Sequence, residues 1–178
     1  MGEVHDPRPL TTEPLSLDLL NTQWIAGGRE RDLLGEPGGP RVWLAAAGHP
    51  GAPADVPALR AARAAIRTAV ADPVDAAALN AVLAHGRLAE RLAASGPERV
   101  LEVDDESWRV PWLAAHDLLE LLRAGPDRIR RCAGHGCVLH FYDTSRSGNR
   151  QWCSMAGCGN RAKARRHYER AREHPGDG

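Results

Sequence analysis

Four cysteines, the only ones in the chain, form two pairs with the same spacing. Each pair is C-x4-C, and fifteen residues separate Cys132/Cys137 from Cys153/Cys158. A Zn²⁺ ion takes four soft ligands in a tetrahedron, and two short loops can bring four thiolates to one point. The spacing therefore predicts one zinc ion held by Cys132, Cys137, Cys153 and Cys158. An all-thiolate site is usually closed to substrate, so this zinc is expected to be structural.

Three other arrangements of these side chains remain open. The thiols could form two disulfides, or they could be four buried free thiols. His135 and His140 could instead join the first pair as a C-x2-H-x-C-x2-H ligand set. That set would leave the pair Cys153/Cys158 without a role, although its spacing repeats that of the first pair. In a reducing compartment, paired cysteines are more often metal ligands than disulfides.

The compartment follows from what the sequence lacks at its start and along its length. The first ten residues, MGEVHDPRPL, contain no basic region followed by an apolar stretch, so no signal peptide is expected. The apolar runs are too short and too often interrupted by charge to span a bilayer. We therefore expect a cytoplasmic protein without a membrane partner.

The charge is unevenly distributed, although the formal net charge is zero. Residues 1–125 contain 12 Arg and 18 Asp+Glu, whereas residues 126–178 contain 11 Lys+Arg and 5 Asp+Glu. Such asymmetry is typical of a basic nucleic-acid-binding part joined to an acidic domain. The boundary is expected near residue 125, where Gly125-Pro126 ends a helix.

The segment 161–172 is the most basic part of the chain, since six of its twelve residues are Arg or Lys. On a helix, Ala164, Tyr168 and Ala171 would form a narrow apolar stripe that packs on the finger, with basic faces beside it. These faces predict contacts with phosphates and base edges. The alternative is a solvated helix whose arginines pack against the acidic N-terminal domain. The predicted nucleic-acid contacts are Arg150, Arg161, Lys163, Arg165, Arg166 and Arg170.

Hydrophobic periodicity predicts a helical domain over residues 15–125, after a loose Pro-rich arm over residues 1–14. Arg60, Arg63 and Arg67 repeat beside the apolar stripe of one helix, as a solvated face would. Helices are expected over 16–24, 42–47, 55–70, 75–92 and 111–122, with a hairpin over 99–110. In residues 126–178, a strand over 138–142 is expected to pair with 150–152 before the basic helix. This order is that of a treble-clef zinc module.

Residues 128–170 resemble the CGNR zinc finger, which is named for the run Cys158-Gly159-Asn160-Arg161. That finger usually follows a helical domain called ABATE, a family of stress-induced transcriptional regulators. The segment LSLDLLNTQW resembles the opening of this domain, with Asp18, Asn21 and Thr22 at matching positions and Leu20 where an aromatic is common. The resemblance implies metal ligation by the four cysteines and DNA binding.

Together these patterns predict a mainly α protein with a small β-hairpin: a helical N-terminal domain plus a C-terminal treble-clef-like zinc finger. No nucleophile–base pair, phosphate loop or metal-binding histidine pair occurs, so an enzyme is not expected. The predicted function is a DNA-binding transcriptional regulator that binds duplex DNA. Its N-terminal domain would sense a small-molecule signal or mediate homodimerisation. Two alternatives are a zinc-dependent protein-interaction module and an RNA-binding accessory protein.

Overall fold

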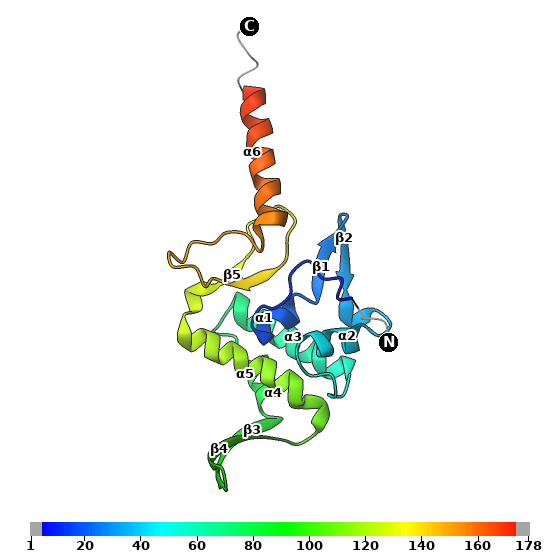
Figure 1. The fold of residues 1–178 in the computed structure, drawn as a ribbon, viewed down its shortest axis with the longest axis vertical. Coiled ribbons are helices and arrows are strands. Elements are labelled where there is room, and N and C mark those ends of the chain that lie inside the picture. Colours follow the sequence, from blue (N-terminus) through cyan, green and yellow to red (C-terminus); the bar gives the residue numbers. More distant parts are fainter. Residues whose placement is uncertain (1–4, 174–178) are drawn as a thin grey trace.

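The computed structural model describes residues 5–173, and it is mainly helical with three small antiparallel sheets (Figure 1). The α-helices are α1 (Leu15–Leu20), α2 (Gly39–Ala46), α3 (Val56–Ala71), α4 (Ala77–Leu83), α5 (Arg109–Ala124) and α6 (Asn160–Glu173). The strands are β1 (Gln23–Ala26), β2 (Arg29–Asp32), β3 (Gly86–Ala93), β4 (Gly96–Val103), β5 (Ile129–Arg131) and β6 (His140–Tyr142). The strands pair in sequence as β1–β2, β3–β4 and β5–β6.

Helices α1, α3 and α5 pack against one another and form the centre of the molecule. The helix α3 begins as the sequence predicts, because the Asp55 carboxylate accepts a hydrogen bond from the Ala58 N–H at 2.8 Å. Its apolar stripe is buried, with Leu59 and Ile66 almost fully excluded from water. Burial of this stripe, rather than intrinsic helix propensity, holds α3 in place.

The predicted helix over 16–24 is only partly right, since α1 ends at Leu20 and a β-hairpin follows. Gly27 and Gly28 form its two-residue turn, with φ of 58° and 76°. Two successive positive φ angles give a turn whose twist matches that of the flanking strands, and glycine adopts them without strain. The Gly-Gly pair therefore turns a hairpin rather than ending a helix.

The predicted helix over 75–92 and the hairpin over 99–110 are also wrong. Helix α4 ends at Leu83, and β3 and β4, each eight residues long, then form a hairpin whose two-residue turn is Ala94-Ser95. Residues 109 and 110 belong to α5 instead of a strand. The β3–β4 ribbon extends from the end of the molecule opposite α6 (Figure 1). Its outer positions carry cross-strand Arg–Glu ion pairs, which suit a ribbon surrounded by water.

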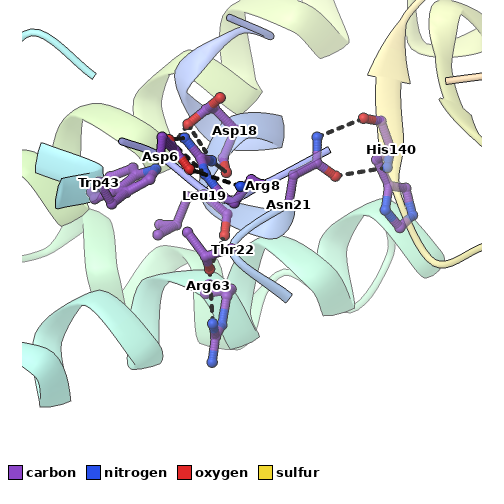
Figure 2. Close-up of polar contacts among 9 residues, drawn as sticks. All are labelled: Asp6, Arg8, Asp18, Leu19, Asn21, Thr22, Trp43, Arg63 and His140. Atoms are coloured by element: carbon purple, nitrogen blue, oxygen red, sulfur yellow. Dashed lines mark hydrogen bonds and ion pairs between the residues drawn. The ribbon is translucent and has the colours of Figure 1, made fainter. Parts of the chain in front are cut away.

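The segment expected to be a loose arm is fixed to the core over its described residues. The Arg8 side chain is fully buried and donates to Asp18 Oδ1 at 2.7 Å, while Asp6 binds the same guanidinium (Figure 2). Trp43 Nε1 donates to the same Asp18 oxygen at 2.8 Å. A buried arginine needs paired acceptors, and these two carboxylates supply them.

Arg63 is not on a solvated face, contrary to the sequence prediction. Its side chain is 5% exposed and makes a bidentate ion pair with Asp32, with N–O distances of 2.6 and 2.8 Å. It also donates to Thr22 Oγ1 at 2.8 Å (Figure 2). Arg60 and Arg67, one turn to either side, are exposed as expected. A local helical pattern cannot show that a carboxylate from β2 arrives beside one of the three arginines.

The C-terminal part shares the core of the N-terminal part. Strand β6 pairs with β5, not with residues 150–152 as predicted, and Phe141 is fully buried in the same hydrophobic cluster as Leu17. The fully buried Asn21 side chain joins the two parts: its amide nitrogen donates to the His140 carbonyl, and its oxygen accepts from the His140 N–H (Figure 2). Both distances are 2.9 Å. One amide thus pairs with a β6 residue as a neighbouring strand would.

Candidate metal centre and basic helix

The four cysteine sulfurs converge on one point. All lie within 4.8 Å of one another, with 3.6 Å between Cys153 and Cys158 and 4.0 Å between Cys137 and Cys153. A tetrahedral zinc with Zn–S bonds of about 2.3 Å sets its sulfurs about 3.8 Å apart. The site can therefore hold one zinc ion. The separations exceed a disulfide bond of about 2.05 Å, and all four cysteines are free, so the disulfide alternative is wrong.

The histidine alternative is not supported either. Within residues 5–173, the side chains that could hold one metal ion together are the four cysteines, without His135 or His140. His135 is exposed in the loop between the first two cysteines, and His140 lies on β6. Burial and the nearby charges of Arg131 and Arg67 lower the pKa of His140 to about 4. The imidazole is consequently neutral at physiological pH.

Hydrogen-bond donors surround the sulfurs. The N–H groups of Cys153 and Gly134 donate to Cys132 Sγ at 3.2 and 3.4 Å. The Arg161 guanidinium donates to Cys158 Sγ at 3.0 Å. Four thiolates around Zn²⁺ would leave a formal charge of about −2, and such outer donors stabilise it. Arg161 therefore has a role at the metal centre.

Gly134 makes the close approach of the two cysteine pairs possible. A Cβ at this position would lie 2.8 Å from Cys158 Sγ and 3.0 Å from Cys158 Cβ. Those contacts are too short for any side chain, so the first loop can reach the second pair only with glycine here. Gly136, in the same loop, has φ of 70° and gives the loop its left-handed turn.

The thiols of Cys137 and Cys153 shift each other's pKa in opposite directions. A hydrogen bond from Cys153 lowers the pKa of the Cys137 thiol to about 5, although burial opposes this. The same interaction with Cys137, together with burial, raises the pKa of Cys153. One sulfur thus ionises readily and the next resists a second negative charge. A metal ion removes this conflict, because a coordinated thiol loses its proton outright.

The second pair is connected directly to the basic helix. Ser154 Oγ accepts from the Gly157 N–H at 3.0 Å and starts one wide turn over Met155–Gly159. This turn contains Cys158, and α6 begins at Asn160, so the metal centre lies at the first turn of α6. The sequence analysis did not identify Ser154 as a site residue. Its signal was only that a small residue follows Cys153.

Helix α6 extends away from the rest of the molecule (Figure 1). The predicted apolar stripe does not pack on the finger, because Ala164 is exposed and Tyr168 is 70% exposed. The side chain of Ala171, the third predicted member, lies outside the described residues. The only element with substantial contact to α6 within residues 5–173 is the turn that carries Cys158. The stripe prediction is wrong for Ala164 and Tyr168, because no residue among 5–173 buries them.

The six predicted nucleic-acid contacts fall into two groups. Arg150 and Arg161 are engaged within the finger. Arg150 donates to the carbonyls of Trp152 and Cys153, and its guanidinium lies 4.1 Å from the Phe141 ring centre. The other four project into solvent along α6, where Arg165 pairs with Glu169 at 2.8 Å. These exposed residues are Lys163, Arg165, Arg166 and Arg170.

Comparisons with known proteins divide the chain into two parts. Residues 128–171 match the family model of the CGNR zinc finger, and residues 13–125 match ABATE, whose description reads "Putative stress-induced transcription regulator". Neither description names an enzymatic activity. A search of curated proteins found no match. Among the helices of residues 5–173, none is long and apolar enough to cross a membrane.

Proposed function

Since the chain belongs to the ABATE family and carries a CGNR zinc finger, we propose that it is a cytoplasmic transcriptional regulator that binds duplex DNA through α6. The zinc would be structural, and the N-terminal domain would sense a signal or mediate dimerisation. No catalytic step is part of this proposal. We also propose a treble-clef-like arrangement, supported by a first cysteine loop that lies between β5 and β6 and by a second cysteine pair that leads into α6.

One observation carries the proposal: within residues 5–173, α6 makes its main contacts with the turn that carries Cys158, and it presents exposed cations along its length. Its 14 residues span about 21 Å at ~1.5 Å per residue. A free-standing helix of this kind can enter a major groove, which is about 12 Å wide. A helix kept for stability would bury one face, and α6 buries none between Lys163 and Arg170.

The surrounding charge supports a polyanionic partner. Residues 128–172 contain 11 Lys+Arg, against the two acidic residues Asp143 and Glu169. Asp143 is fully buried, where it accepts hydrogen bonds from the N–H groups of Ser145 and Arg150 and lies 4.0 Å from Arg130, so it pairs within the finger and does not face a partner. Four exposed cations in contact with phosphates would give a slope of log K against log salt of roughly −3.6.

The test removes three of these charges. We expect the triple variant Arg165→Ala, Arg166→Ala, Arg170→Ala to lose most of its affinity for duplex DNA while it keeps its zinc, measured by fluorescence anisotropy and metal analysis. The matched control is Arg87→Ala, Arg91→Ala, Arg99→Ala, which removes the same charge from the β3–β4 ribbon. Unchanged affinity in the first variant, or equal loss in both, would contradict the proposal.

The same assay separates the alternatives when it includes single-stranded DNA and structured RNA at two salt concentrations. Preference for the RNA would favour an RNA-binding accessory protein. Absence of salt-dependent binding to all three would favour a protein-interaction module. A single helix reads a short site, so we also propose that a homodimer supplies specificity. Light scattering after size-exclusion chromatography tests this, and a strict monomer at micromolar concentration would contradict it.

A further inference from the structure

A hollow between the N-terminal helices and the zinc finger has polar groups that the metal centre does not use. It consists of two adjoining lobes of about 280 and 540 Å³. Both lobes are lined by Arg67 from α3 and by Val138 and His140 from the finger. The hollow therefore lies between the two parts of the chain that are joined by Asn21.

Each wall of the larger lobe carries one arginine beside apolar side chains. Arg131 and His140 are directly opposed in the β5–β6 register, so their side chains lie on one face of the hairpin together with Ile129. Opposite them, the last turn of α3 presents Arg67 and Val70. The remaining lining residues, Ala71 and Val138, are small and apolar.

Both arginines lack a carboxylate partner. Twelve other arginines of residues 5–173 have an Asp or Glu within 4.0 Å, but Arg67 and Arg131 do not. Arg67 is instead oriented by a neutral group, since it donates to Gln23 Oε1 at 2.6 Å. Arg67 also lies near Asp32 and Glu30, but partial burial and the nearby Arg63 outweigh these charges and give the pKa of Arg67 a net decrease.

We propose that the larger lobe binds a small organic acid, with its carboxylate between Arg67 and Arg131 and its apolar body against Val70, Ile129 and Val138. Arginine forks bind carboxylates with two parallel hydrogen bonds, and small-ligand pockets combine a few such groups with an apolar wall. Glu30 lines the smaller lobe and repels an anion there, so the carboxylate belongs in the larger one.

Such a ligand would touch α3 and the β5–β6 hairpin at once. Its binding free energy would therefore stabilise the docking of the finger on the N-terminal helices. The signal that the N-terminal domain senses would then be a small organic acid. This regulatory role rests on the proposed function. The binding itself does not require DNA, so the two can be tested separately.

The experiment titrates the zinc-loaded full chain with benzoate at millimolar concentrations, without DNA, and follows backbone amides by NMR. We expect saturable shifts centred on residues 67–71, 129–131 and 138–140. The double variant Arg67→Gln, Arg131→Gln should bind at least about tenfold more weakly, because charged hydrogen bonds each contribute ~1.5–3 kcal/mol. The control Arg41→Gln, Arg146→Gln removes the same charge from exposed positions that do not line the hollow.

Two further ligands test the chemistry of the site. Benzamide has the same shape without the charge and should not bind, and inorganic phosphate should bind more weakly than benzoate because it lacks an apolar body. The proposal is overturned if benzoate gives no saturable shift, if benzamide binds equally, or if phosphate binds more tightly. Equal weakening in the double variant and its control would also overturn it.

Discussion

Helices α3 and α6 are both rich in arginine and similar in length, but different interactions fix their positions. The helix α3 buries an apolar stripe that includes Leu59 and Ile66, and this packing brings Arg63 to the Asp32 carboxylate. The helix α6 has no such stripe and depends on Cys158 and its metal. An arginine that α3 turns toward the core, such as Arg63, becomes part of the fold, whereas the exposed arginines of α6 beyond its first turn stay available to a partner.

Removal of the metal should give the largest difference in behaviour between α3 and α6. Structural zinc contributes about 10–16 kcal/mol to the folding of small zinc modules. Chelation should therefore broaden or shift the amide resonances of residues 128–171 and end the fixed orientation of α6, while those of α3 and α5 persist. Two-dimensional NMR before and after EDTA measures this. If chelation left the amide resonances of α6 unchanged, the metal would not be what fixes this helix.

The next largest effect is expected from Arg63→Met. Breaking a buried ion pair costs about 3–5 kcal/mol, and the lower end applies because Asp32 is 25% exposed. Arg60→Met is the matched control on the same helix, since Arg60 is 49% exposed and lies 3.7 Å from the same carboxylate. It should cost less than about 1 kcal/mol. Urea denaturation compares the free energies of unfolding, and equal losses would show that burial does not distinguish the two arginines.

Asn21→Ala tests the connection between the two parts of the chain. It removes two hydrogen bonds to the His140 backbone from a fully buried position, so we expect a loss of about 2 kcal/mol. Amide exchange of β5 and β6 should also quicken, although zinc is retained. The control Asn80→Ala removes an exposed amide from α4 and should change neither quantity. Slow exchange in Asn21→Ala would mean that the finger docks without this amide.

The smallest effect is a pH dependence. Burial alone would raise the pKa of Asp32, but hydrogen bonds and charge from Arg63 give it a net decrease below 3.8. A depressed carboxyl pKa contributes stability that is present above about pH 3.9 and is lost as the pH falls through the folded value. The difference in unfolding free energy between the wild type and Arg63→Met should thus shrink as the pH falls below 4. A difference in unfolding free energy that does not change with pH would show that Arg63 does not lower the pKa of Asp32.

The sequence predicted the elements that depend on local signals. The Asp55 cap starts α3, Gly125 follows the end of α5, and the four cysteines converge as their spacing indicated. The β3–β4 hairpin was missed because Leu88 and Leu92 fit both a helical repeat and an alternating strand. The turn at Ala94 and Ser95 decides between these two patterns only when both strands are considered.

The site shows the same limit. Cysteine spacing predicted the ligands, but the separation of inward from outward arginines depends on tertiary contacts. Arg150 lies over Phe141, and Arg63 lies against a β2 carboxylate that is 31 residues away in sequence. Sequence periodicity cannot predict these tertiary contacts. For α6 the sequence predicted a contact that the structure lacks. An apolar stripe at helical spacing predicts a packing neighbour, and none of the described residues packs on that stripe.

The amide of Asn21 also limits how these two modules can be exchanged in evolution or by engineering. A finger moved onto another host would carry its β6 edge without the side chain that satisfies it, and would expose Phe141 to water. Productive transplants must therefore bring helix α1 as well, which makes the first helix of one family model and the second strand of the other a single inherited unit.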